Sequence, residues 1–155
     1  MKLGDVIKKE RQRKKLSVAD CAGQLGLADA DYEALESGQS PAEQWGPRLA
    51  RIAVKLSVPT SRLISETGRA CDSRKAEGQC GRLIAGQRTR RGIAREELSS
   101  WLATSPEEVS YIESGKSPIE GYGPVLLGFA EIVDLPIFNL FYPCGLPLDA
   151  LDDYP

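Results

Sequence analysis

Histidine is absent from this 155-residue sequence, which also has only four cysteines. The commonest general base is therefore missing. The cysteines, at positions 21, 71, 80 and 144, show no C-x-x-C spacing, which argues against a structural zinc site and favours free thiols over a bridge between Cys71 and Cys80. The sequence also lacks a G-x-S-x-G elbow, a Walker loop and a dinucleotide fingerprint. Nothing here argues for an enzyme, and we expect no metal or cofactor.

Long apolar runs are missing too. No run approaches the roughly 18 residues of a membrane helix, and residues 1–15 contain no apolar core of signal-peptide length. The hydrophobic share of 41% is nevertheless that of a globular protein. We therefore expect a cytoplasmic protein that does not enter a membrane, large enough for one ordinary domain or two small ones.

An unusual stretch occurs twice. The sequence ESGQSPAEQWGP at 36–47 returns as ESGKSPIEGYGP at 113–124, an offset of 77 residues. The same offset aligns 3–64 with 80–141 without a gap and pairs Gly4 with Gly81 and Arg11 with Arg88. The chain is thus predicted to contain two copies of one small unit. The predicted division is a first domain at 1–66, a linker at 67–79, a second domain at 80–142 and a tail at 143–155.

Each copy has the pattern of five short helices. In the first copy, apolar spacing and capping residues predict helices over about 3–14, 17–25, 29–37, from Pro47 to about 56, and over 60–65. Pro47 is assigned to a first helical turn, where proline is favoured, so Trp45 falls in a loop. In the second copy, Ser105 and Glu108 form the pattern of a capping box.

The ordered elements R-x-x-x-x-(L/I), L-(G/A), (I/L)-E-x-G and L-x-x-(I/F)-A-x-x-(L/V)-x-(V/L)-P occur in both copies. Together they resemble the phage repressor and Cro (XRE) type of helix-turn-helix protein. The resemblance implies an all-α fold of two tandem five-helix domains. It also implies structural ion pairs between Arg11 and Glu36 and between Arg88 and Glu113, followed by a glycine with positive φ.

In that family the third helix of each domain enters the major groove of DNA. The resemblance therefore implies a DNA-binding transcriptional regulator whose two copies act as a covalent pseudo-dimer. Cations beside the helices are the expected anchors, with Arg95 the single strongest candidate. The DNA-binding positions carried over are Lys14, Lys15, Ser17, Asp29, Ala30, Glu33, Gln39, Arg90, Arg91, Arg95, Ser105, Glu107, Ser110 and Lys116.

The charges at these positions keep an alternative open. Asp29 and Glu107 make both recognition turns acidic, whereas arginine, asparagine and glutamine read bases well. The acids either accept a hydrogen bond from cytosine or complement the helix N-terminus. The alternative function is a protein-interaction module on a helix-turn-helix scaffold that has weak or no DNA binding. Trp45 and Tyr122 are expected to cover the core, or else to serve as surface aromatics for binding.

The end of the second copy is more apolar than the matching part of the first, since PIFNLF stands where the first copy has PTSRLI. The excess apolar side chains must be buried against the tail, the first copy or a second chain. This predicts either a homodimer or docking within one chain, through Ile137, Phe138, Phe141 and Tyr142.

Overall fold

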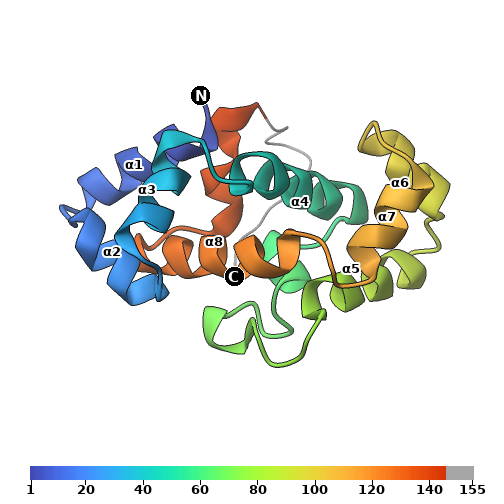
Figure 1. The fold of residues 1–155 in the computed structure, drawn as a ribbon. Helices are drawn as coiled ribbons and strands as arrows, with labels where there is room; N and C mark the ends of the chain where they lie inside the picture. The colour runs from blue at the N-terminus through green and yellow to red at the C-terminus, as the bar shows by residue number, and fades with distance from the viewer. Residues whose placement is uncertain (146–155) are drawn as a thin grey trace.

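A computed structural model describes residues 1–145, and within that range every regular element is helical. Eight α-helices and four short 3₁₀ helices follow one another along the chain (Figure 1). The α-helices are α1 (Leu3–Arg13), α2 (Val18–Leu25), α3 (Asp29–Ser37), α4 (Ala42–Leu56), α5 (Gln79–Arg90), α6 (Arg95–Trp101), α7 (Pro106–Glu113) and α8 (Ile119–Ile132). The 3₁₀ helices are η1 (Thr60–Leu63), η2 (Ala70–Asp72), η3 (Ile137–Leu140) and η4 (Tyr142–Cys144).

The first three helices of each copy begin and end close to the residues that the sequence predicts. Ser17 caps α2 and forms a complete capping box with Asp20. Ser105 likewise accepts a hydrogen bond from the backbone N–H of Glu108, but the Glu108 carboxylate bonds to Arg48 instead, so the expected second capping box is half formed. Gly38 and Gly115 adopt φ values of 77° and 79°, as the resemblance implies.

The fourth helix of each copy begins before the predicted residue. Helix α4 starts at Ala42, which places Trp45 and Pro47 inside the helix and not in a loop. The Ser40 side chain accepts from the backbone N–H of Ala42, and Pro41 supplies the restricted φ that favours a helix start. The assignment of Pro47 to the first turn was therefore wrong, because the pair Ser40–Pro41 already provides the start signal.

Helices α4 and α8 connect the two copies. The first turn of α4 lies on its own copy, where Glu43 accepts from the backbone N–H groups of Leu3 and Gly4. Further along, α4 contacts the second copy: Trp101 of α6 donates its indole N–H to the carbonyl of Arg51, and Arg51 donates to the carbonyl of Trp101, at 2.8 and 2.7 Å.

The fourth helix of the second copy, α8, contacts the first copy in the same way. Helix α8 begins on α5, and its later residues reach the first copy, where the rings of Phe129 and Tyr32 lie 6.5 Å apart. At the end of α8, Arg13 donates to the carbonyl of Val133, and Lys14 pairs with Asp134 at 2.8 Å. Each group of three helices is therefore completed by part of the fourth helix of the other copy. Two separate five-helix domains are not shown.

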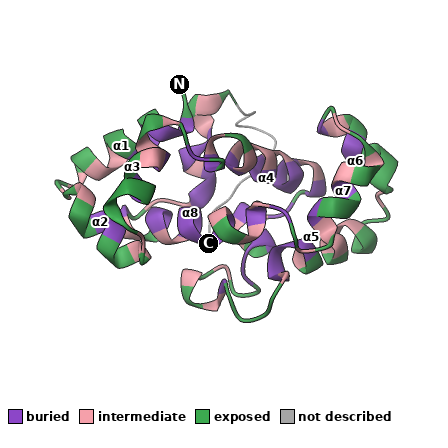
Figure 2. Ribbon diagram, viewed as in Figure 1, coloured by how far each residue is buried: buried purple, intermediate pink, exposed green. Residues whose placement is uncertain are grey.

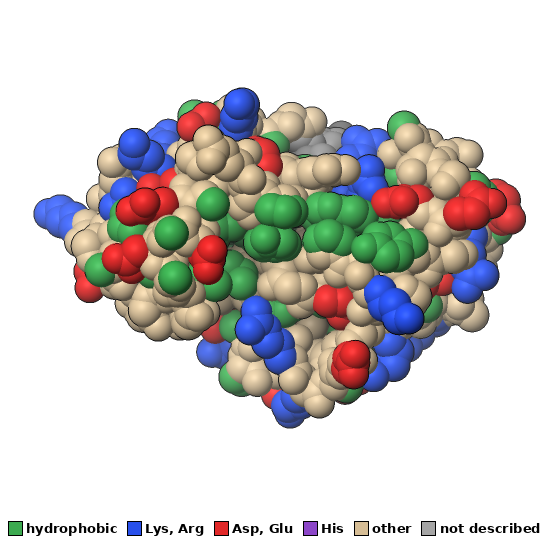
Figure 3. Space-filling view, in the orientation of Figure 1, with side chains coloured by type: hydrophobic (Ala, Val, Ile, Leu, Met, Phe, Trp, Pro, Cys, Tyr) green, Lys and Arg blue, Asp and Glu red, His purple; other side chains and the backbone are tan. Residues whose placement is uncertain are grey.

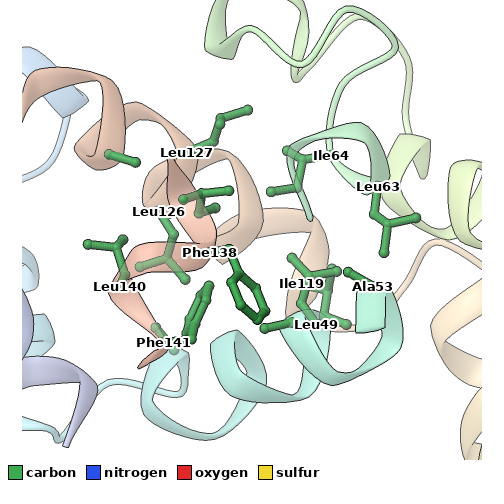
Figure 4. Close-up of a cluster of buried hydrophobic side chains, with 14 of the residues drawn as sticks. Leu49, Ala53, Leu63, Ile64, Ile119, Leu126, Leu127, Phe138, Leu140 and Phe141 are labelled. Carbon is green, nitrogen blue, oxygen red and sulfur yellow. The ribbon is translucent and has the colours of Figure 1, made fainter. Parts of the chain in front are cut away.

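One continuous hydrophobic core follows from this exchange. Figure 4 shows side chains from both copies meeting where α4 and α8 pack together, among them Leu49, Ile64, Leu126 and Phe138. Figure 2 shows that the buried residues concentrate along α4 and α8. A single copy would leave these faces exposed to water.

The apolar end of the second copy lies inside this core. Ile137, Phe138 and Phe141 are each at most 2% exposed, and Phe138 packs edge-to-face on Tyr142. Burial within one chain therefore covers most of the apolar excess without a second molecule. A homodimer remains a prediction that nothing in this arrangement requires.

The repeat relates α1 to α5, α2 to α6, α3 to α7 and α4 to α8. Figure 1 shows the two three-helix groups at opposite ends of the molecule, with α4 and α8 between them and α3 and α7 on the near side. This placement agrees with the contacts of α8 with α2 and of α4 with α6. Among residues 1–145, no helix has the length and hydropathy needed to cross a bilayer.

Candidate recognition surface

The third helix of each copy is fixed to the first by a partly buried ion pair. In the first copy, Arg11 donates from Nε and Nη2 to the Glu36 carboxylate at 2.6 and 3.1 Å, and from Nη1 to the carbonyl of Leu16 at 2.8 Å. In the second copy, Arg88 bonds to Glu113 and to the carbonyl of Ile93 in the same way. The guanidinium thus joins three segments, and the neighbouring carboxylate raises the pKa of each arginine.

The two ion pairs differ in one respect. Glu113 also accepts from Arg95 at 3.1 Å, whereas the equivalent position to Arg95 in the first copy is Val18. Glu113 would therefore keep one cationic partner if Arg88 were lost, but Glu36 would keep none.

We expect Arg11→Ala to lower the free energy of unfolding by about 3 kcal/mol, because it leaves the partly buried Glu36 carboxylate without a cationic partner. Arg88→Ala should cost less, since Arg95 still pairs with Glu113. Urea unfolding of both variants measures the difference. The double variant Arg88→Ala/Arg95→Ala should match Arg11→Ala or exceed it. Equal losses for the two single variants would contradict this role for Arg95.

The second acid of the repeated stretch, Glu43 in the first copy and Glu120 in the second, has a structural role that the sequence did not predict. The carboxylate of Glu43 accepts from the backbone N–H groups of Leu3 and Gly4 at 2.7 and 3.0 Å, and Glu120 accepts from those of Cys80 and Gly81 at 3.1 and 2.8 Å. A carboxylate from α4 or α8 therefore caps the start of the first helix of its own copy. The conservation of both acids across the 77-residue offset was the available signal.

The positions that the resemblance assigns to DNA reading lie at the surface. Exposed side chains at these positions are Ser17, Asp29, Ala30, Glu33 and Gln39 in the first copy, and Ser105, Glu107, Ser110 and Lys116 in the second. The structure thus brings them to the exposed sides of α3 and α7 and to the turns that flank α2, α3 and α7. Whether they contact DNA stays a prediction.

Several of the predicted cationic anchors already have partners within the chain. Arg95 pairs with Glu113, Lys14 pairs with Asp134 at the end of α8, and Arg91 bonds to Gln87. Lys15 and Arg90 are exposed and make no ion pair among residues 1–145. The strongest candidate for base reading, Arg95, would have to leave a carboxylate to do so.

The third helices themselves are acidic. Helix α3 carries Asp29, Asp31, Glu33 and Glu36, helix α7 carries Glu107, Glu108 and Glu113, and neither helix has a lysine or an arginine. The acids in each first turn complement the partial positive charge of the helix N-terminus. The same acids repel the phosphates of a duplex brought against these helices.

Aromatic side chains lie between the two acidic helices. Trp45 of α4 meets Tyr111 of α7 edge-to-face with the ring centres 6.3 Å apart, so the contact joins the two copies. Arg48 lies 4.8 Å above the indole ring and pairs with Glu108 at 3.0 Å, which fixes the indole from the other direction. Tyr122, the repeat equivalent of Trp45, is partly exposed at the corresponding place on α8.

We name the contacting pair Trp45 and Tyr111 the aromatic band. Figure 3 shows hydrophobic side chains crossing this face of the molecule, with acidic side chains toward both ends. Tyr111 is 41% exposed, and apart from Met1 it is the most exposed large hydrophobic residue in the described chain. The sequence offered both roles for Trp45 and Tyr122. The structure gives them a partly buried position that rests on the core and still reaches the surface.

The reactive side chains elsewhere in residues 1–145 do not form a second site. Burial, assisted by the nearby Glu120 carboxylate, raises the pKa of the Cys80 thiol to about 12, which keeps it protonated at neutral pH. The four cysteines are free, and no group of acids and cysteines in the described part of the chain is placed to hold a metal ion.

Comparisons of the chain with protein-family models, with curated proteins and with solved structures find no match. A family is therefore not identified, and the function has to be argued from the surface described above.

Proposed function

We propose that this chain is a protein-interaction module built on a paired helix-turn-helix scaffold, and that the face formed by α3, α7 and the aromatic band contacts a protein partner. One observation carries the proposal: the two third helices hold seven acids and no cation, and the partly exposed Trp45 contacts the exposed Tyr111 of α7 beside them. Exposed aromatics beside charged residues are typical of protein-binding surfaces.

DNA binding through the same face meets an electrostatic obstacle. A duplex carries one negative charge per about 1.7 Å of its axis, and proteins gain most of their non-specific affinity by neutralising phosphates. Helix α3 would bring Asp29, Asp31 and Glu33 toward that charge without a compensating cation. Lys116, in the turn after α7, is exposed and makes no ion pair among residues 1–145, but it lies in the second copy.

A sequence-specific DNA-binding regulator is the second candidate. It is supported by the placement of α3 and α7 on one face about an approximate two-fold axis, since dimeric repressors present two recognition helices in this way. It is also supported by the resemblance to the repressor and Cro type. Under this candidate the acids limit affinity, and their removal should reveal binding.

A photo-reactive residue at Ser110 separates the two candidates, because Ser110 is exposed on α7 one residue from Tyr111. In cells that naturally make this chain, we expect irradiation to yield covalent adducts with protein. The same residue at Glu77, which is exposed in the linker, serves as the control. Nucleic-acid adducts at Ser110 would support the regulator and contradict the interaction module. Protein adducts that are no more frequent at Ser110 than at Glu77 would also contradict the interaction module.

A gel-shift at low salt gives an independent result. We expect the unmodified chain not to bind random-sequence duplex. Asp29→Asn with Glu107→Gln should not create binding if the face contacts protein. If this double variant binds duplex and loses binding with added salt, the helices enter a groove and the regulator is the better account.

A further inference from the structure

We infer that the aromatic band is the docking site for a basic amphipathic α-helix of the partner, laid across the face from α7 toward α3. The inference rests on the proposed function and adds the chemistry of the partner. Three observations support it: the apolar surface is preformed, the acids beside it make no ion pair, and other occupants fit the surface less well.

The apolar surface is preformed. Trp45 is held by Tyr111 at its edge and by Arg48 at its face, and Arg48 is itself fixed by Glu108. Side chains already held in this way lose little rotamer freedom when a partner binds. Tyrosine and tryptophan also supply large contact areas with few rotatable bonds, which is why they dominate binding hot spots.

The acids beside the band are available to a partner. Glu107 precedes Tyr111 by four residues on α7, so the two side chains share one side of the helix. On α3, Asp29 and Glu33 are exposed, and none of these three acids makes an ion pair within residues 1–145. A partner that covers the band therefore meets unneutralised negative charge on both copies, and lysine or arginine beside its apolar anchors satisfies that charge.

A helix fits this surface better than the other common forms of peptide. Strand addition requires an exposed sheet edge, and the described chain contains no strand. An amphipathic helix presents apolar side chains along one stripe with charged side chains on either flank. That pattern matches an apolar band bordered by acids.

A second copy of this chain does not supply the complement. It exposes cations at many positions, among them Lys8, Lys15, Arg62, Arg90 and Lys116, but no stripe of large hydrophobic side chains lies exposed beside them in the described range. Apart from Tyr111 itself, Met1 is the only exposed large hydrophobic residue in the described range. The occupant is therefore a different chain.

A model peptide tests the inference. The probe is a helical peptide of about 15 residues made of leucine and lysine with apolar residues at helical spacing. A peptide of the same composition with alternating leucine and lysine is the comparison. The chain has two tryptophans, so Trp101→Phe leaves Trp45 as the sole indole fluorophore. Titration calorimetry on the unmodified chain gives a second measurement that does not depend on this substitution.

We expect the helical peptide to shift the Trp45 emission to saturation with a Kd on the order of 10 µM, weakening as salt screens the acids. Tyr111→Ser should weaken binding at least roughly tenfold, and Glu107→Gln roughly threefold. Glu77→Gln, which removes an exposed acid in the linker, should leave the affinity unchanged.

Equal binding of the alternating peptide, or full binding by Tyr111→Ser, overturns the inference. So does the absence of saturable binding by both methods. Protein adducts at Ser110 without peptide binding would leave the interaction module standing and remove only the basic amphipathic helix. Peptide binding without protein adducts would contradict the interaction module and, with it, the inference, and would leave only an affinity of this surface for such peptides.

Discussion

Gly81→Ala should destabilise the protein by about 3 kcal/mol or more, a large share of the roughly 5–15 kcal/mol that stabilises an ordinary domain. A Cβ atom at Gly81 would lie 2.5 Å from the carbonyl oxygen of Ile112, 2.7 Å from the backbone nitrogen of Gly115 and 2.8 Å from the carbonyl oxygen of Glu113. All three contacts are with backbone, so no side-chain rotation relieves them. Helix α5 would have to move away from the end of α7, which also weakens the bond between Arg88 and Glu113.

Gly86→Ala on the same helix is the matched control. A Cβ there meets no atom within 4 Å, so alanine should raise stability by about 0.5–1 kcal/mol through its better helix propensity. Thermal and urea unfolding of the two variants compares one substitution at two sites on α5. A small loss at Gly81 would mean that α5 and α7 do not approach as closely as described.

Cleavage of the linker should leave the two copies associated, and this is the second large effect that the fold predicts. A protease site inserted between Lys75 and Ala76 lies at an exposed part of the chain. After cleavage, each fragment still contributes its fourth helix to the other, with Tyr32 against Phe129 and Trp101 bonded to Arg51. We expect the nicked protein to elute from gel filtration at the volume of the intact chain and to separate only in denaturant.

The uncut insertion variant controls for disturbance of the linker. Two peaks of half the mass under native conditions would show that each copy folds alone, and the exchange of α4 and α8 would then be wrong. Phe129→Ala in the cut protein should promote separation, because it removes a ring that is 1% exposed between the copies.

The local structure was largely predictable from sequence because its signals are local. Ser17 and Ser105 mark helix starts, Gly38 and Gly115 mark ends, and apolar spacing marks the buried sides. The bond between Arg11 and Glu36 followed from the family resemblance, and the structure forms it in both copies. The start of α4 was misplaced because Pro47 is a strong signal that also occurs inside a helix.

The exchange between copies could not be predicted from the repeat. Leu49 aligns with Leu126, and Ile52 aligns with Phe129, so each fourth helix offers nearly the same apolar face. A three-helix group can accept either face with similar burial. The choice depends on the path from α3 to α4 and on contacts such as that between Leu25 and Gly128, where an added Cβ would lie 3.0 Å from the leucine side chain. The spacing of apolar residues along the sequence does not determine the path of the chain from α3 to α4.

The candidate surface was predictable only in its parts. The acids of α3 and α7 and the two aromatics of the repeated stretch were visible in the sequence. Their combination was not, because Tyr111 meets Trp45 only through the crossing of α4 from one copy to the other.

The exchanged fourth helices also limit how this protein can evolve. A recombination event at the linker would transmit only part of the shared core, so neither repeat is a unit that can be inherited, deleted or shuffled alone. A change at Phe129 alters the environment of Tyr32 in the other repeat, and its compensation has to arise there. The repeats are thus free to diverge on their exposed sides, as Ala28 and its equivalent Ser105 illustrate, while their interiors must change together.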